Sequence, residues 1–262
     1  MPGEHHWQLE LGGETSLVGF RRDGEGRRTG VFVHGFRSHC DGAKSRYLSQ
    51  IAGAHGHAWL RFDQRGCGLS GGAFRRFTLS GAIEDLHRVL EALGEPPCIL
   101  VGSSLGGLIA VHVAASGRHP VDGLVLVAPA LRFTDRFIHG HLDARDLERW
   151  RSRGYRWFPD LYEGGCYRLD YSFCADALCY GPAPVELPCP VRVVHGGRDE
   201  LLPPGDTQQW FGSLRCPSRS GGKVLEIVAE GDHRLTGWTD VIARQIESLR
   251  ETLRREVSKP CA

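Results

Sequence analysis

The chain has 262 residues, of which 41% are hydrophobic and 24% charged, and its formal net charge is +1. This length fits one α/β domain with room for an insertion, and it can bury a large core. The near-neutral charge gives no electrostatic reason to expect nucleic acid or an anionic membrane as a partner. No apolar run reaches the ~18 residues that a membrane-spanning helix needs, so we expect no membrane span.

Cysteine spacing and the N-terminal segment bear on metals, redox chemistry and location. The nine cysteines are scattered and form no C-x-x-C pair, so they lack the spacing of zinc or thioredoxin-like sites. The first ten residues are polar and acidic, unlike a signal or transit peptide. We therefore expect free thiols in a cytoplasmic protein, with no metal and no organic cofactor.

Taken in order, the chain alternates between short apolar runs and amphipathic stretches. Weak alternation at the start predicts an edge hairpin of His6–Leu11 and Leu17–Arg22. Apolar runs predict strands at Val31–Val33, Ala58–Phe62, Ile99–Val101, Val121–Val127, Val191–Val194 and Val224–Val228. The runs at Val31–Val33 and Val121–Val127 are expected to be buried. Helical spacing predicts helices at Lys44–Ala54, Leu79–Leu93, Leu105–Ala115, Asp206–Leu214 and Asp240–Arg255. Strands that alternate with helices indicate a single α/β domain, 1–262, with a doubly wound and mostly parallel sheet.

The alternation breaks after the sixth strand, over residues 132–184. This segment holds one expected helix, Asp143–Arg153, followed by an irregular stretch, and it carries five of the six tyrosines. Its aromatic residues either form a small core that holds the insertion down or line the inner face of a lid over an apolar pocket. Both interpretations can hold at once.

A Gly102-x-Ser104-x-Gly106 motif lies between the strand at Ile99–Val101 and the helix at Leu105–Ala115. A glycine-rich turn without chemistry could produce the same letters in a chain with 35 glycines. The strand before the motif and the helix after it favour a nucleophile turn, in which small residues let the two backbones approach closely. We therefore predict that Ser104 is a nucleophile.

Nucleophilic serine chemistry also needs a base and an acid, in the chain order Ser, acid, His. Asp199 follows the predicted strand Val191–Val194, and His233 follows the next strand along the chain. The carboxyl ends of parallel strands are where catalytic groups gather in open sheets. The sequence therefore predicts Ser104, His233 and Asp199 as nucleophile, base and acid, with Glu200 as the fallback acid.

Other polar residues near strand ends have structural explanations. His34, at the end of Val31–Val33, is expected to shape the turn that follows, and His195 is expected to be structural as well. Asp63 precedes Arg65-Gly66, which indicates a salt-bridged turn. Asp232 adjoins His233, but neighbours on an extended loop usually point apart.

Two backbone amides are candidates for binding a developing oxyanion. The Leu105 N–H begins the helix after Ser104, and the Phe36 N–H lies on the loop after Val33. Each such donor is worth roughly 3 kcal/mol in the transition state.

Together these motifs resemble the α/β-hydrolase superfamily. The matching pieces cover about 200 residues in conserved order and are His34-Gly35-Phe36, Asp63-x-Arg65-Gly66-x-Gly68-x-Ser70, Gly102-x-Ser104-x-Gly106, His195-Gly196-x-x-Asp199 and Gly231-Asp232-His233. A finer pattern, Gly35-Phe36-Arg37-Ser38-x-x-x-Gly42-x-Lys44, resembles the branch of animal mitochondrial acyl-protein thioesterases that also cleave acyl glucuronides, and its bacterial carboxylesterase relatives. This resemblance implies ester or thioester hydrolysis by Ser104, Asp199 and His233.

The sequence thus predicts a serine hydrolase that acts on small-molecule acyl esters or thioesters through an acyl-enzyme. A carbon–carbon bond hydrolase, an acyltransferase or a non-enzymatic ligand receptor on the same scaffold remain alternatives, because fold and triad do not choose among them. Neither the natural substrate nor the oligomeric state can be read from the sequence.

Overall fold

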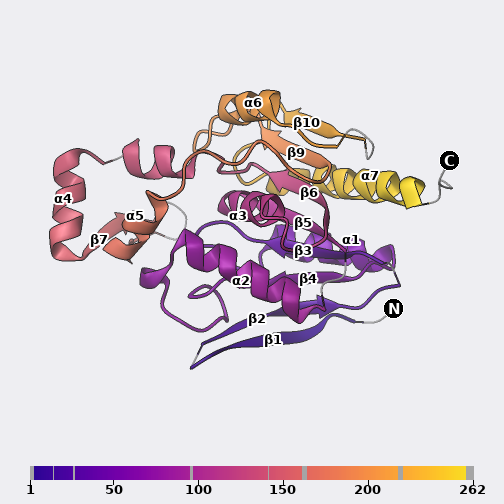
Figure 1. Cartoon of the computed structure of the whole chain (residues 1–262), viewed down its shortest axis with the longest axis horizontal. Coiled ribbons are helices and arrows are strands. Elements are labelled where there is room, and N and C mark those ends of the chain that lie inside the picture. Colours follow the sequence, from indigo (N-terminus) through magenta and orange to yellow (C-terminus); the bar gives the residue numbers. More distant parts are fainter. Residues whose placement is uncertain are drawn as a thin grey trace.

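The computed structural model describes residues 3–13, 15–25, 27–94, 97–140, 142–160, 164–217 and 221–257. Within these ranges, one eight-stranded sheet runs through the molecule with helices on both of its faces (Figure 1). Its strand order is β1-β2-β4-β3-β5-β6-β9-β10. The doubly wound, mostly parallel α/β sheet expected from the sequence is confirmed.

The observed elements follow the expected alternation closely. The strands of the large sheet are β1 (His5–Gly12), β2 (Thr15–Arg22), β3 (Thr29–Val33), β4 (Trp59–Phe62), β5 (Cys98–Ser103), β6 (Val121–Val127), β9 (Val191–Gly196) and β10 (Lys223–Val228). The helices that flank it are α1 (Ala43–Ala54), α2 (Leu79–Ala92), α3 (Leu105–Ala115), α6 (Pro204–Ser213) and α7 (Thr239–Val257). Strands β1 and β2 form the expected antiparallel hairpin, and β2 also pairs antiparallel with β4. The pairings from β4 through β10 are parallel.

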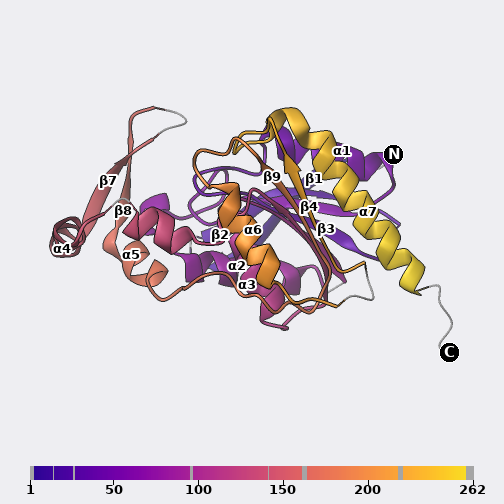
Figure 2. The ribbon, with the colours of Figure 1, turned by 90° about the horizontal axis from the view of Figure 1, so that it is seen from above.

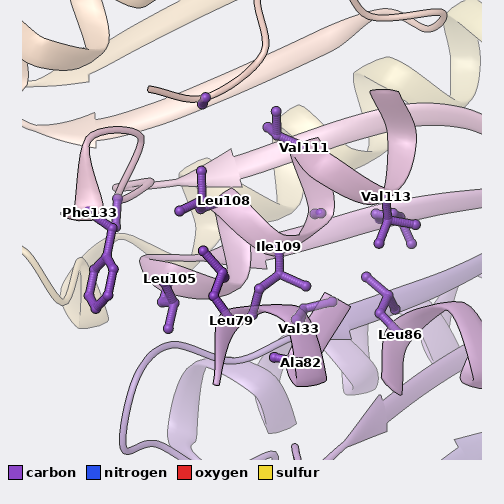
Figure 3. Close-up of a cluster of buried hydrophobic side chains, with 14 of the residues drawn as sticks. Val33, Leu79, Ala82, Leu86, Leu105, Leu108, Ile109, Val111, Val113 and Phe133 are labelled. Atoms are coloured by element: carbon purple, nitrogen blue, oxygen red, sulfur yellow. The ribbon is translucent and has the colours of Figure 1, made fainter. Parts of the chain in front are cut away.

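Two hydrophobic cores cover the two faces of the sheet. Residues of α1 and α7 pack on one face, and residues of α2, α3 and α6 pack on the other. The two groups of helices lie on opposite sides of the strands in Figure 2. Figure 3 shows α3 against its neighbours: Leu108 and Ile109 lie in the cluster that also holds Leu79 and Leu86 of α2. Helix α3 is apolar on all sides because it is buried between the sheet and α2.

The burial of the central strands explains why apolar runs in the sequence predicted the strand positions well. In β5, β6 and β9 nearly every residue is buried, as expected of parallel strands covered on both faces. The edge strand β1 instead alternates between exposed and half-buried side chains. The carboxyl ends of β3, β4, β5, β6, β9 and β10 all reach the same edge of the sheet, where the loops carry the predicted site residues.

The segment after β6 stands beside the sheet in both views (Figures 1 and 2). It contains a π-helix (Thr134–His139), α4 (Ala144–Arg153), the hairpin β7 (Tyr155–Pro159) and β8 (Cys166–Asp170), and α5 (Tyr171–Ala177). The expected helix is confirmed, with Asp143 capping its N-terminus through the amide of Asp146. The expectation of an irregular stretch after it is wrong. The strands β7 and β8 have only five residues each, and β7 carries aromatic residues on both faces, so the sequence gives no clear strand signal there.

The eight cysteines within the described residues are free thiols; Cys261 lies outside them. In the same part of the chain, no helix combines the length and the apolar character needed to cross a bilayer.

Candidate functional site

Ser104 lies on a strained turn between β5 and α3. Its φ is 53° and its ψ is −120°, a conformation that costs a non-glycine residue free energy. The turn is possible because its neighbours lack side chains. A Cβ on Gly102 would lie 2.4 Å from the Gly106 carbonyl oxygen, and a Cβ on Gly106 would lie 2.1 Å from the Val33 carbonyl oxygen. The two glycines therefore let the strand, the helix and the β3 backbone meet beneath the Ser104 hydroxyl.

The structure brings together the three residues predicted to act as nucleophile, base and acid. His233 Nε2 lies 3.1 Å from Ser104 Oγ, and His233 Nδ1 lies 2.7 Å from Asp199 Oδ2. The three side chains come from the loops after β5, β9 and β10. The hydrogen-bonded chain requires the Nδ1–H of His233 to point at the carboxylate, which leaves Nε2 free to accept the serine proton.

Asp199 is buried, and both of its carboxylate oxygens have hydrogen-bond partners. Its Oδ1 accepts hydrogen bonds from the amides of Leu201 and Leu202, at 3.0 and 2.8 Å, and its Oδ2 lies 3.1 Å from His195 Nε2. Burial raises the pKa of this carboxyl, but the hydrogen bonds from His195 and His233 outweigh that effect and hold the pKa well below its usual range. Asp199 is therefore an anion at neutral pH, aimed at the Nδ1 of His233.

His195 is a partner of Asp199 that sequence reasoning missed. It is fully buried, its Nε2 also lies 2.9 Å from the Leu202 carbonyl oxygen, and its Nδ1 lies 3.0 Å from Thr207 Oγ1. The sequence suggested only a structural role. Its position four residues before Asp199, at the end of β9, places its ring beside the carboxylate, but that spacing carries no recognisable periodic signal.

The loop after β3 passes close to Ser104. A Cβ on Gly35 would lie 3.1 Å from Ser104 Cβ and 3.6 Å from its Oγ, so the Gly35–Phe36 peptide lies against the nucleophile. Leu105 is the first residue of α3, so its amide has no acceptor within the helix. These are the two amides that the sequence suggests as oxyanion donors.

The Phe36 ring is the centre of an aromatic cluster. It packs on rings from both the main domain and the insertion, with centroid separations between 5.2 and 6.0 Å. These rings belong to Phe74, Phe77, Phe133, Phe137, Tyr167 and Phe173. The aromatic residues of the insertion therefore pack against the main domain around Phe36 and hold the insertion in place.

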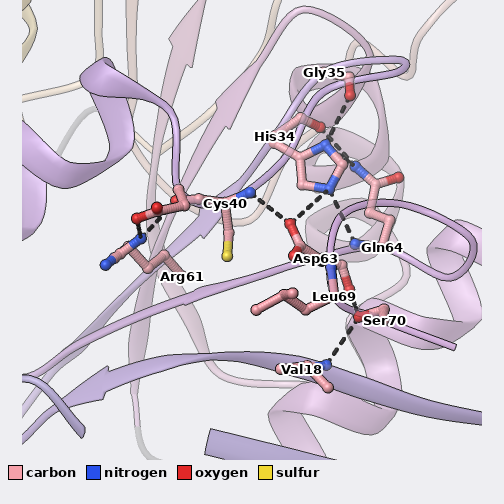
Figure 4. Close-up of polar contacts among 10 residues, drawn as sticks. Val18, His34, Gly35, Cys40, Arg61, Asp63, Gln64, Leu69 and Ser70 are labelled. Carbon is pink, nitrogen blue, oxygen red and sulfur yellow. Dashed lines mark hydrogen bonds and ion pairs between the residues drawn. The ribbon is translucent and has the colours of Figure 1, made fainter. Parts of the chain in front are cut away.

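A second polar network fixes the start of this loop (Figure 4). His34 is buried: its Nε2 accepts the amide N–H of Gln64 at 3.0 Å, and its Nδ1 lies 2.8 Å from the Gly35 carbonyl oxygen. Burial lowers the pKa of His34, which favours the neutral ring that these contacts require. His34 thus shapes the turn before Phe36, as expected.

The expected salt-bridged turn at Asp63 is wrong in its detail. Asp63 accepts amide hydrogen bonds from Cys40 at 2.5 Å and from Leu69 at 2.8 Å (Figure 4). Arg65 pairs with Asp85 of α2 instead. The carboxylate is satisfied by backbone donors because the loops 35–42 and 64–70 both fold over it.

Lys44, at the start of α1, is a charged residue close to the site. Its Nζ donates to Ser103 Oγ at 3.1 Å, directly beside the candidate nucleophile. Burial lowers the pKa of Lys44 to about 8, although the carboxylate of Asp232 opposes that shift. Spacing alone gave no indication of this contact, because 59 residues separate Lys44 from Ser103.

Left-handed backbone conformations gather around the same edge of the sheet. Among the described residues, the non-glycine positions with positive φ are Arg37, Ser104, Ala128 and Leu235. Each lies on a loop that follows β3, β5, β6 or β10. Such conformations persist only where the surrounding structure imposes them.

Within the described ranges, the group that could hold a metal ion is His55, His57 and Glu247. It lies before β4, at the sheet edge opposite Ser104. Glu247 Oε2 lies 3.4 Å from His55 Nδ1 and 3.2 Å from His57 Nε2. The Arg254 guanidinium lies 3.4 Å from the same His57 nitrogen, and its positive charge disfavours a cation there.

Comparison with known proteins agrees with this architecture. The profile of the family described as serine aminopeptidase, S33, matches residues 24–163. Palmitoyl-protein thioesterase ABHD10, mitochondrial, from Mus musculus is 31% identical over 216 residues, which are 80% of this chain and 70% of that protein. The protein of the same name from Homo sapiens is 30% identical over 219 residues, 80% of this chain and 68% of its own length.

Solved structures extend the likeness to almost the whole chain. Alpha/beta hydrolase domain-containing protein 10 from mouse has a TM-score of 0.82 and 27% identity, over 95% of this chain and 99% of that chain. A protein from Agrobacterium vitis S4 has a TM-score of 0.81 and 29% identity, over 97% and 99%. The curated relatives are mitochondrial by name, so the cytoplasmic location expected here stays a prediction. Family profile, relatives and fold agree that this chain belongs to the α/β-hydrolase superfamily as a relative of the ABHD10 thioesterases, an enzyme of the esterase or thioesterase type.

Proposed function

We propose that this enzyme cleaves carboxylic esters or thioesters through a covalent acyl-enzyme on Ser104. The observation that carries the proposal is the chain of contacts from Ser104 Oγ to His233 Nε2 (3.1 Å) and from His233 Nδ1 to Asp199 Oδ2 (2.7 Å). A nucleophile within reach of a base, and a base oriented by an acid, is the arrangement that activates a hydroxyl for acyl transfer.

In the acylation step, Ser104 Oγ attacks the acyl carbonyl carbon while His233 Nε2 takes the hydroxyl proton. The buried carboxylate of Asp199 stabilises the imidazolium that forms and holds its tautomer. The amides of Phe36 and Leu105 donate hydrogen bonds to the oxyanion, and the N-terminal end of α3 favours its negative charge. The bond to the alcohol or thiol then breaks, and the leaving group takes the proton from His233.

Deacylation repeats these steps with water. His233 removes a proton from a water molecule as its oxygen attacks the acyl-enzyme, and Ser104 regains the proton when the acid departs. The full cycle consumes the ester and one water molecule and releases the acid and the alcohol or thiol.

The insertion, residues 132–184, is proposed as a lid that encloses the acyl group. Its rings meet the Phe36 ring beside the nucleophile. Such walls favour an apolar acyl chain, at roughly 0.8 kcal/mol for each buried methylene. The name of the ABHD10 relatives, palmitoyl-protein thioesterase, supports long acyl thioesters as the first substrates to test.

The decisive experiment is steady-state hydrolysis of p-nitrophenyl esters and of acyl thioesters of graded chain length, with wild type and Ser104→Ala compared. We expect turnover that disappears in the variant, and covalent labelling of wild type alone by a fluorophosphonate, located at Ser104 by mass spectrometry. Ser103→Ala is the matched control, because the neighbouring hydroxyl points at Lys44, and it should keep the label. Binding of acyl compounds without turnover by a folded protein would contradict the proposal and favour a ligand receptor.

A further inference from the structure

A cleft lies between the main domain and the hairpin of the insertion. Its volume is about 610 Å³, within the range of small-molecule sites. Its lining includes Arg37, Phe74, Arg75, Trp157, Tyr167 and Arg168. Neither Ser104 nor His233 lines it, so a carbonyl that reacts at Ser104 lies outside this cleft.

The charge of the cleft is positive. Arg75 donates to Asp170 Oδ2 at 2.6 Å, and Arg168 donates to Asp170 Oδ1 at 3.1 Å. Two guanidinium groups therefore share one carboxylate, which leaves a net positive charge, and both arginine side chains are more than a third exposed. Guanidinium groups are well suited to bind phosphate oxygens because their donors form a planar fork.

Aromatic faces lie beside these charges. Trp157 is 59% exposed and is paired across the hairpin with Arg168. On the opposite wall the Arg37 guanidinium pairs with the buried carboxylate of Asp160 and lies 4.2 Å from the centroid of the Tyr167 ring, so the positive charge left over in the cleft is that of Arg75 and Arg168. An exposed indole next to a guanidinium offers a stacking surface for a planar base beside a binding site for its phosphates.

The cleft is connected to the nucleophile by a short loop. Gly35 lies against Ser104, and Arg37, two residues later, lines the cleft. Two residues span at most roughly 7 Å. The rings of Phe74 and Tyr167, which line the cleft, also pack on the Phe36 ring. The cleft and the nucleophile therefore lie on the two sides of Phe36, within reach of a single extended substrate.

We propose that the cleft binds the leaving group of the thioester, and that this leaving group is a thiol carrying a phosphorylated nucleotide, as in coenzyme A. This inference rests on the proposed function, since it names the substrate class of the same site. When Ser104 Oγ forms its bond to the acyl carbon, the C–S bond breaks, and the thiolate takes the proton from His233. The phosphates lie against Arg75 and Arg168, and the base lies on Trp157.

The test compares three thioesters of one acyl group: decanoyl-coenzyme A, decanoyl-phosphopantetheine and the neutral decanoyl-N-acetylcysteamine. We expect kcat/KM to be about tenfold higher for the coenzyme A ester than for the neutral one, as for a charge-assisted contact. That advantage should fall as salt screens the charges. The double variant Arg75→Gln, Arg168→Gln should remove it, whereas Arg149→Gln, an arginine of the same insertion outside the cleft lining, should retain it.

The phosphopantetheine ester separates the two sources of a phosphorylated thiol. Trp157→Ala should reduce kcat/KM for the coenzyme A ester and leave that for phosphopantetheine unchanged, because only the first carries a base. If both esters are equally good in wild type, the site recognises the phosphate alone and the nucleotide assignment is wrong. Equal values for the charged and the neutral esters would overturn the proposal while leaving the hydrolase function intact.

A binding measurement tests the assignment of the cleft independently of catalytic turnover. Calorimetric titration of the Ser104→Ala enzyme with coenzyme A should give a dissociation constant that rises about tenfold in the background of Arg75→Gln and Arg168→Gln. Absence of binding to the folded enzyme would refute the assignment of the cleft, even if esters are hydrolysed. Binding without hydrolysis of any ester would instead refute the proposed function.

Discussion

At the scale of single residues, Asp199 determines the tautomer and the orientation of the His233 ring. The carboxylate accepts from the His233 Nδ1 and is held by two amides and by His195. If residue 199 carried an amide in place of the carboxylate, its NH₂ group could face His233 Nδ1 and favour the tautomer with the proton on Nε2, which cannot accept the serine proton.

We therefore expect Asp199→Asn to lower kcat for ester hydrolysis by roughly 10⁴-fold, as this change does in a serine protease triad. The measurement is single-substrate kinetics with a p-nitrophenyl ester. Glu200→Gln is the matched control, because this neighbouring acid is exposed and should retain nearly full activity. An Asp199→Asn enzyme that stays as active as the Glu200→Gln control would contradict the assigned role of Asp199.

Lys44 gives a prediction on pH. Burial lowers its pKa to about 8, whereas an unfolded lysine titrates near 10.4. Between these values the unfolded chain binds more protons, so this group makes the native state more stable as pH rises from about 8 to about 10. In urea unfolding, wild type should gain stability relative to Lys44→Met over that range. Lys44→Arg, which stays charged, should lack the same gain, and parallel curves for all three proteins would contradict the assignment.

At the scale of elements, the turn from β5 into α3 depends on the absence of side chains. A Cβ on Gly106 would lie 2.1 Å from the Val33 carbonyl oxygen, a backbone atom that cannot rotate away. We expect Gly106→Ala to lower the free energy of unfolding by more than about 3 kcal/mol, as severe core changes do. Gly212→Ala is the control in helix α6, where a Cβ would meet nothing within 4 Å, and it should stabilise by up to about 1 kcal/mol.

The insertion is held to the main domain by its aromatic residues. Phe173 of α5 is fully buried and contacts the rings of Phe36, Phe77 and Trp150. Phe173→Ala should cost about 3–5 kcal/mol of stability in chemical denaturation. Trp157→Ala, in the exposed hairpin of the same insertion, should change stability by less than about 0.5 kcal/mol. A small effect at Phe173 would mean that the insertion is held by other contacts.

At the scale of the whole molecule, the predictable features were those with a regular pattern. The central parallel strands and the amphipathic helix α2 were located within a residue or two. Burial on both faces leaves a continuous apolar run in the sequence, and burial on one face leaves a helical period. The sequence singled out Ser104, Asp199 and His233 because each follows a predicted strand, and the structure brings these three side chains together. The hairpin β7–β8, the contact of His195 with Asp199 and the hydrogen bond of Lys44 were missed, since they depend on how distant loops meet.

The left-handed residues around the site have a consequence for how this enzyme can be altered. Arg37, Ser104, Ala128 and Leu235 each keep a positive-φ backbone conformation, which costs a non-glycine residue on the order of 1–3 kcal/mol. Glycine at the positions other than Ser104 would relieve that cost and loosen the loops that orient the reacting groups. Selection for heat resistance alone would therefore favour glycine at these positions, although the rigid loops there orient the reacting groups. Catalytic activity should be measured alongside stability in each round of selection.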